Sequence, residues 1–160
     1  MIYLKEIIEE NFSECIHLKV AEAQKSFVAS NVYSLAQAWL YPENARPFAI
    51  YSNDLMVGFL MIDIDYNCGS TKNACWLWRL MIDEKYQGQG YGKAAMQELI
   101  HYVKNVLKAK MFETSIVHGN ETAEKLYGSL GFIRNGELEC EHTLGKSLVY
   151  LFAWLVRQRK

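Results

Sequence analysis

A change of hydrophobic period near residue 90 divides this chain into two parts that must fold differently. Before that point, β-rich runs at residues 47–51, 55–65 and 74–82 are separated by turn residues, which predicts an antiparallel meander. After it, apolar residues recur at the spacing of one helix face: Ala95, Leu99, Tyr102, Val103 and Val106. A strand at residues 111–117 follows. The helix therefore joins two strands that should be parallel, and we expect a ligand at their junction.

Shorter elements complete the pattern. Residues 3–5 predict a first strand, Asn11 is expected to cap a helix after it, and residues 32–39 predict a second helix that Pro42 ends. Two strands close the chain, the last at residues 148–156. The element order predicts one domain of the α/β class, with a mixed sheet of about seven strands and four helices.

Composition excludes several functional classes. A chain of 160 residues that is 51% hydrophobic and 22% charged can bury one core. A net charge of −1 and a pI near 6.4 lack the basic surface of a nucleic-acid binder. No apolar run approaches a bilayer span and the first residues do not resemble a signal peptide, so we expect a cytosolic protein without membrane contact. The cysteines lack metal-ligand spacing and predict no metal site; three are expected to act as small core hydrophobes, while Cys68, in a turn, is the one that could react.

A glycine-rich turn precedes the long helix. It consists of Gln87, Gly88, Gln89, Gly90, Tyr91 and Gly92. Three glycines let the main chain approach a phosphate with no Cβ in the way. A helix N-terminus adds unpaired amides and the positive end of the helix dipole. The turn therefore predicts a diphosphate site.

Other glycine-rich motifs fit less well. A Walker A loop needs four residues between its first glycine and Gly-Lys, followed by Ser or Thr; here three residues separate Gly88 from Gly92, and Ala94 follows Lys93. A dinucleotide fingerprint reads G-x-G-x-x-G near the start of a parallel sheet, whereas this turn reads G-x-G-x-G after a meander. A flexible strand-to-helix connection remains the structural alternative.

Two motifs at matching spacing resemble the GNAT N-acetyltransferase superfamily. The first is Q/R-x-x-G-x-G/A, present as Gln87, Gly90 and Gly92. The second is an asparagine, Asn120, that opens a helix ending in L-Y-x-x-L-G-F at residues 126–132. The resemblance implies a GNAT-like fold and an enzyme that uses acetyl-coenzyme A as cosubstrate. No metal is expected.

The resemblance also assigns roles to individual residues. Main-chain groups of Leu80, Met81 and Ile82 would pair with the pantetheine arm in a gap between two parallel strands. The phosphates would meet the amides from Gln87 to Lys93. For the Lys93 side chain two placements are open: beside the phosphates, where it would add charge, or in solvent. Asn120 would cap its helix and bond the pantetheine. Tyr127 would protonate the leaving thiolate, although its helix face also suits a core tyrosine.

The expected reaction is direct attack of an amine on the thioester. Several polyamine acetyltransferases carry a glutamate base on the strand before the phosphate turn, and the matching residue here is Trp78. Arg79 beside it cannot accept a proton. The base is therefore unassigned, and the candidates are Glu43, Asp63, Asp65 and Glu141.

The stretch at residues 78–93 looks most like bacterial diamine and polyamine acetyltransferases, which makes a small amine the expected partner. Five acids between residues 22 and 66 would suit a polycation, and Tyr33, Trp39 and Tyr41 could add cation–π contacts. An aminoglycoside-like drug, a protein amino group or a non-catalytic acetyl-coenzyme A sensor are the alternatives. The apolar strand at residues 148–155 would be hazardous as an exposed edge, which predicts a homodimer that covers it.

Overall fold

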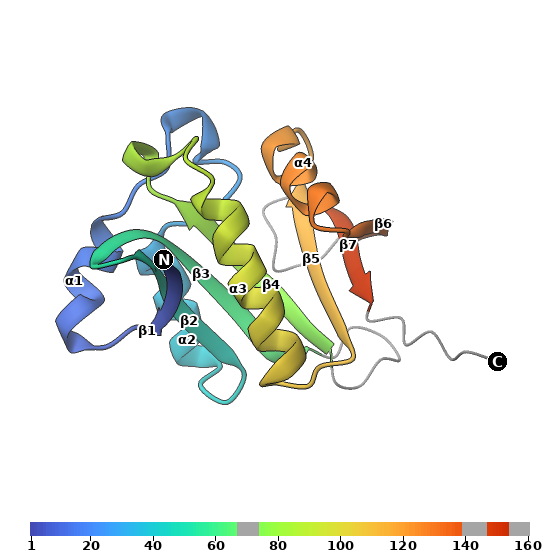
Figure 1. Ribbon diagram of the computed structural model, residues 1–160, viewed down its shortest axis with the longest axis horizontal. Helices are drawn as coiled ribbons and strands as arrows, with labels where there is room; N and C mark the ends of the chain where they lie inside the picture. Colours follow the sequence, from blue (N-terminus) through green and yellow to red (C-terminus); the bar gives the residue numbers. More distant parts are fainter. Residues whose placement is uncertain (67–73, 139–146, 154–160) are drawn as a thin grey trace.

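A computed structural model describes residues 1–66, 74–138 and 147–153. Seven strands form one sheet in the order β1-β2-β3-β4-β5-β7-β6 (Figure 1). The strands are β1 (Ile2–Glu6), β2 (Ala45–Ser52), β3 (Leu55–Tyr66), β4 (Ala74–Ile82), β5 (Met111–Val117), β6 (Ile133–Leu138) and β7 (Ser147–Ala153). The α-helices are α1 (Glu9–His17), α2 (Asn31–Leu40), α3 (Tyr91–Asn105) and α4 (Glu121–Ser129). The predicted α/β fold, the meander and the element order are confirmed.

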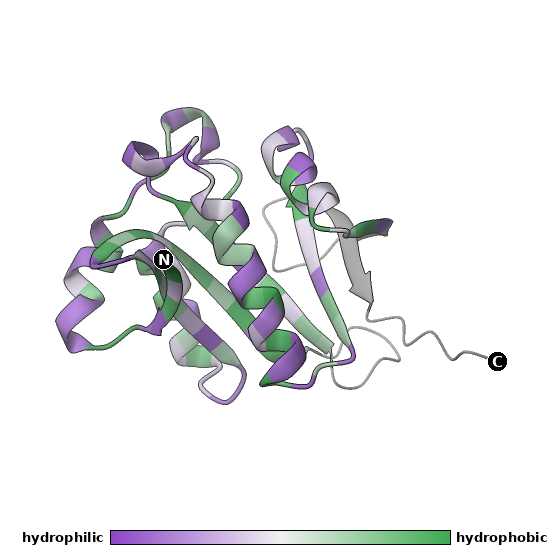
Figure 2. Ribbon diagram, viewed as in Figure 1, coloured by the Kyte–Doolittle hydropathy of each residue, from purple (hydrophilic) through white to green (hydrophobic). Residues whose placement is uncertain are grey.

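Helices cover both faces of the sheet. Side chains of α3 and α4 share one core cluster with alternate residues of β2 to β5, whereas α1 and α2 pack with a second cluster on the opposite face. Figure 2 shows the amphipathic character of α3, with green residues along one side and purple ones along the other. Ala95, Leu99 and Val103 are fully buried as predicted, but Val106 is 62% exposed because it lies at the C-cap, where the helix ends.

The parallel pair between β4 and β5 is short. Its pairs run from Ala74↔Met111 to Leu77↔Thr114 and stop there. Beyond this last pair, residues 79–82 of β4 pair only with β3, and residues 115–117 of β5 pair only with β7. The sheet is therefore divided by a V-shaped gap whose vertex is the Leu77–Thr114 pair.

A β-bulge lies just beyond this vertex. Met61 on β3 pairs with Arg79 but the next residue, Ile62, pairs with Leu77, which leaves Trp78 without a partner. One extra residue reverses the alternation of side chains along the strand. Cys75 and Leu77 face the α3 side before the bulge, and Leu80 and Ile82 face it afterwards.

The predicted N-cap of α1 was wrong, whereas the predicted second helix is confirmed as α2. The N-cap of α1 is Ile8, and Asn11 lies at the third helical position, where its Oδ1 accepts from the Ile8 amide at 2.8 Å. On α2, the side facing the core carries Asn31 and Ser34, while Val32 is 56% and Trp39 83% exposed. The small polar residues face inward because they make hydrogen bonds there: Asn31 donates to the Cys15 carbonyl and Ser34 to the Ser30 carbonyl.

The last strand is not an edge. β7 lies between β5 and β6 and pairs with both, so its backbone groups are used within the chain. The reason for predicting a homodimer is therefore removed. Residues 154–156, predicted to belong to this strand, lie outside the described residues, as do Cys68 and Cys140.

Candidate active site

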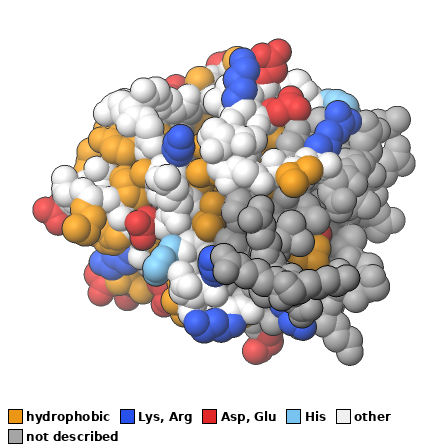
Figure 3. Space-filling view, turned by 45° about the vertical axis from the view of Figure 1, so that its right-hand side comes forward, with side chains coloured by type: hydrophobic (Ala, Val, Ile, Leu, Met, Phe, Trp, Pro, Cys, Tyr) orange, Lys and Arg blue, Asp and Glu red, His pale blue; other side chains and the backbone are white. Residues whose placement is uncertain are grey.

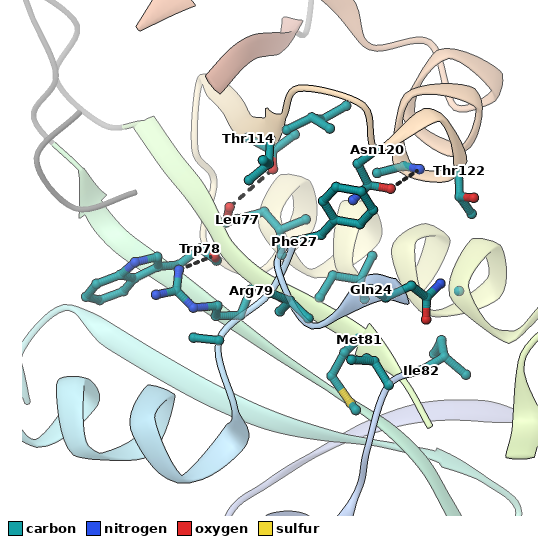
Figure 4. A pocket seen from close by; sticks show the side chains of 18 of the residues that line it. Gln24, Phe27, Leu77, Trp78, Arg79, Met81, Ile82, Thr114, Asn120 and Thr122 are labelled. Carbon is teal, nitrogen blue, oxygen red and sulfur yellow. Dashed lines mark hydrogen bonds between the residues drawn. The ribbon is translucent and has the colours of Figure 1, made fainter. Parts of the chain in front are cut away.

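A cleft of about 1190 Å³ opens where β4 and β5 separate. Its walls come from α2, the end of β4, the glycine-rich turn, the end of β5 and the start of α4 (Figure 4). The volume suits an extended ligand with a second molecule beside it, since typical small-molecule sites enclose about 300–1,000 Å³. The predicted ligand position at the β4–β5 junction coincides with this cleft.

The glycine-rich turn is held in a left-handed conformation at one rim of the cleft. Gly88 has φ of 76° and Gly90 of 81°, values that favour glycine. The side chain of Gln87 closes the turn by donating to the Ile82 carbonyl at 2.9 Å. Asp83 anchors the start of the turn, because its carboxylate accepts hydrogen bonds from the amides of Lys19 and Lys85.

The turn ends in a helix N-terminus suited to an anion. Gly90 is the N-cap of α3 and supplies no side-chain acceptor. The first backbone bond of the helix runs from the Ala94 amide to the Gly90 carbonyl. Amides ahead of Ala94 have no partner within the helix and are directed at the rim, as phosphate binding requires.

Most of the predicted cofactor residues line this cleft. They are Leu80, Met81, Ile82, Gln87, Gly88, Gly90, Tyr91, Gly92, Lys93, Asn120 and Tyr127. Gln89 does not line it; its side chain is exposed and lies against the Lys85 carbonyl. Contacts with a cofactor remain predictions for all of them.

The helix after β5 begins and ends as predicted. The Asn120 side chain accepts from the Ala123 amide at 3.2 Å, which is its capping role. Gly131, with φ of 90°, ends the helix, and the Phe132 amide donates back to the Tyr127 carbonyl. These two caps fix the position of Tyr127 at the inner end of the cleft.

Tyr127 is a buried phenol that borders the cleft. It is 5% exposed, and its ring lies 5.5 Å from that of Phe132. Burial raises the pKa of Tyr127 to about 12, and a hydrogen bond with the Thr114 side chain opposes part of that rise. The phenol is therefore fully protonated at neutral pH, which is the state that an acid requires.

The bulge and Arg79 shape the opposite wall. The Arg79 guanidinium donates to the Trp78 carbonyl at 2.8 Å and to Gln37 Oε1 on α2 at 2.8 Å. It also lies 5.5 Å from the centre of the Trp78 ring, which in turn makes an edge contact with Tyr41. Arg79 thus satisfies the carbonyl that the bulge leaves unpaired and ties it to α2.

The charges around the cleft differ from the expected acidic groove. Among the described residues that line it, the charged side chains are Arg79 and Lys93, and none is Asp or Glu. Glu43 and Asp63, two candidates for the base, lie elsewhere; the side chains of Asp65 and Glu141 are outside the described set. Over the described part of the face shown in Figure 3, acidic and basic side chains are interspersed.

Sequence reasoning missed several residues of the cleft. Gln24 and Phe27 reach it from the segment between α1 and α2 (Figure 4). Gln24 accepts a hydrogen bond from the Gln87 side chain. No pattern in that segment marked them. Thr114 did carry a signal, because it is the polar residue on the buried side of β5.

Two features are absent from the described residues. None of their helices is long and apolar enough to cross a membrane. No group of His, Cys, Asp or Glu among them could hold a metal ion.

Comparison with known proteins identifies the family. The family model described as "Acetyltransferase (GNAT) family" matches residues 4–132. The chain belongs to the GNAT acetyltransferase family. This GNAT protein is 32% identical over 140 residues to the spermine/spermidine N(1)-acetyltransferase of Bacillus subtilis (strain 168), a match covering 86% of this chain and 91% of that protein. It is therefore an N-acetyltransferase.

Solved structures agree on the fold. The aminoglycoside acetyltransferase AAC(6')-Ib in complex with coenzyme A superimposes with a TM-score of 0.78 at 14% identity, covering 96% of this chain and 95% of that one. The spermidine N-acetyltransferase of Vibrio cholerae, in complex with coenzyme A and spermine, gives 0.73 at 14% identity and covers 95% of each chain. At this identity the likeness concerns the GNAT fold alone.

Proposed function

We propose that this GNAT acetyltransferase moves the acetyl group of acetyl-coenzyme A directly to a primary amine of a polyamine or diamine. The observation that carries acetyl transfer is the single cleft that joins a helix N-terminus free for phosphate to a buried, protonated Tyr127. The curated relative, a spermine/spermidine acetyltransferase, favours the polyamine. Free buried thiols at Cys15 and Cys75 favour action in the reducing cytoplasm.

In the proposed reaction the amine attacks the thioester and Tyr127 protonates the leaving thiolate. General acid catalysis of this kind is worth about 10² to 10⁴ in rate. The attacking amine must be neutral, yet an alkylamine with a pKa near 10.4 is neutral in only about one molecule in a few thousand at pH 7. Since the described lining offers no carboxylate or histidine, water in the open cleft is the proposed proton acceptor.

The side chains that line the cleft around Arg79 favour a second class of amine as the acetyl acceptor. Arg79 and the aromatic side chains of Tyr33, Tyr41 and Trp78 face the amine side, and no described acid does so. Such a wall would accept an amine bearing an aromatic or carboxylate group better than a polycation, because like charges repel. The two classes of acceptor predict different orders of kcat/KM for a set of amines.

The test is release of free coenzyme A from acetyl-coenzyme A with a panel of amines. The panel contains spermidine, spermine, putrescine, an aminoglycoside, a lysine peptide, phenylethylamine and a dipeptide with a free amino terminus. A higher kcat/KM for spermidine than for phenylethylamine supports the polyamine proposal, and the reverse ranking supports the second class. If no amine is acetylated while acetyl-coenzyme A still binds, the proposal of catalysis would be replaced by that of a non-catalytic acetyl-coenzyme A sensor.

A further inference from the structure

Thr114 interrupts an otherwise apolar side of β5. Alternate residues of this strand are buried, and Phe112 and Ile116 join the core beneath α3 and α4. Thr114 lies between them and is 1% exposed. A hydroxyl buried at such a position costs free energy unless it is hydrogen-bonded. The bonds that it makes therefore indicate why a polar residue is tolerated here.

The Thr114 hydroxyl lies where the sheet divides. Leu77 and Thr114 form the last pair of the β4–β5 ladder. Thr114 Oγ1 donates to the Leu77 carbonyl at 3.2 Å (Figure 4). Beyond this pair the strands part and the cleft begins. The hydroxyl thus joins the two strands at the vertex of the cleft.

The same hydroxyl meets the phenol of Tyr127, to which it is hydrogen-bonded. A threonine hydroxyl has one proton and two lone pairs. While its O–H group donates to the Leu77 carbonyl, Thr114 can only accept a hydrogen bond from Tyr127. If the O–H group rotates toward Tyr127, the hydrogen bond to Leu77 is broken. The Thr114 hydroxyl can therefore donate either to the Leu77 carbonyl or to the Tyr127 oxygen.

We propose that Thr114 is the positioning residue for acid catalysis: it holds the Tyr127 hydroxyl at the vertex and, once Tyr127 has given up its proton, turns its own O–H group to donate a hydrogen bond to the phenolate. This inference rests on the proposed acetyl transfer with Tyr127 as the acid. The Tyr127 O–H bond breaks as an S–H bond forms on the leaving thiolate. The phenolate then regains a proton from water, which has taken the proton lost by the attacking amine.

The need for such a residue follows from acidity. A phenol whose pKa is raised to about 12 is a far weaker acid than a coenzyme A thiol, for which a value of about 8.5 is typical. Transfer from the phenol to the thiolate is then unfavourable by more than about a thousandfold. A hydroxyl that stabilises the phenolate reduces this deficit, because hydrogen bonds to the charged form favour it.

The decisive experiment is a double-mutant cycle with Thr114→Val and Tyr127→Phe. Valine keeps the shape of threonine and removes the hydroxyl. We expect Thr114→Val to lower kcat about tenfold in the wild-type background, with little change in KM for acetyl-coenzyme A, and less than twofold when Phe occupies position 127. Thr114→Ser, which keeps the hydroxyl, should restore most of kcat. An equal fall of kcat in both backgrounds would show a merely structural role and overturn the inference.

A second measurement does not depend on turnover. Carbon-13 labelling of tyrosine Cζ, with NMR in an equal mixture of H₂O and D₂O, resolves two signals for a phenol whose hydroxyl exchanges slowly. We expect two signals for Tyr127, assigned through Tyr127→Phe, which merge in Thr114→Val and persist in Thr114→Ser. Two signals in the wild-type protein, in Thr114→Val and in Thr114→Ser alike would also overturn the inference. Lack of turnover by the wild-type protein, in contrast, would count against the proposed function alone.

Discussion

At the scale of single residues, Tyr127, the proposed acid, has a property that can be measured without substrate. Burial raises the pKa of Tyr127 to about 12 in the folded state from its ordinary value of 10.0. Its protonated form is therefore favoured by folding. The resulting stability is fully present below pH 10 and is lost as the pH rises from 10 through 12.

This titration gives the first prediction. Between pH 9 and pH 11, the free energy of unfolding should fall more steeply in the wild-type protein than in Tyr127→Phe, by roughly 1 kcal/mol at pH 11. Urea denaturation at several pH values measures the difference. Other tyrosines titrate in both proteins and cancel in the comparison. Parallel curves for the two proteins would mean that the phenol is not buried as described.

A second prediction concerns Gly90, whose surroundings leave room for a side chain but whose φ of 81° does not suit one. Gly90→Ala should weaken acetyl-coenzyme A binding about tenfold, because a left-handed conformation costs roughly 1–2 kcal/mol for alanine. Isothermal titration calorimetry measures the dissociation constant. The matched control is Gly128→Ala on α4, which is helical with open space around it and should stabilise the fold by about 0.5–1 kcal/mol. Unchanged binding in Gly90→Ala would argue against the turn as the phosphate site.

At the scale of secondary-structure elements, the sequence predicted more of the architecture than of the surfaces. Periodicity located α3 and the strands, because burial on one face leaves a regular pattern. It located α2 but did not indicate that Asn31 and Ser34 lie on the core side of that helix. It could not reveal the bulge at Trp78, because an extra residue in a strand depends on pairing with β3. Thr114 was overlooked although it is the polar residue on the buried side of β5, because its partners Leu77 and Tyr127 lie on other elements.

The bulge supplies a third prediction. Arg79→Met should leave the Trp78 carbonyl without its donor and release the strand from Gln37, at a cost of about 1–3 kcal/mol in stability. The KM for the amine should rise more than the KM for acetyl-coenzyme A, because Trp78 lines the part of the cleft proposed to bind the amine. Steady-state kinetics and thermal unfolding measure both effects. Arg79→Lys should restore little, since lysine lacks the forked geometry that reaches two acceptors. A KM effect confined to the cofactor would contradict the assignment of this wall.

At the scale of the whole molecule, the gap in the sheet predicts a structural role for the cofactor. Beyond Leu77 and Thr114, the described residues of β4 and β5 form no ladder pair with each other. A pantetheine arm in the gap would contact both halves of the sheet and bind the folded state only. At one hundred times its dissociation constant, such a ligand adds about 2.7 kcal/mol to the free energy of unfolding.

The fourth prediction follows from that linkage. Acetyl-coenzyme A should raise the unfolding temperature, and hydrogen exchange should slow at residues 78–82. Pantetheine, which lacks the diphosphate, should have a much smaller effect at the same concentration, because it cannot reach the amides of the turn. Differential scanning calorimetry and exchange mass spectrometry provide the measurements. Equal protection by the two ligands would place the binding energy elsewhere in the cleft.

The bulge also bears on how the enzyme can diversify. Trp78 is paired to neither neighbouring strand, so a substitution there changes the amine wall without breaking a ladder or disturbing the residues that face α3. Under the proposed function, a lineage can therefore exchange one amine acceptor for another through mutations in a single codon while the rest of the fold stays unchanged. Directed evolution toward new amines should start at the same codon.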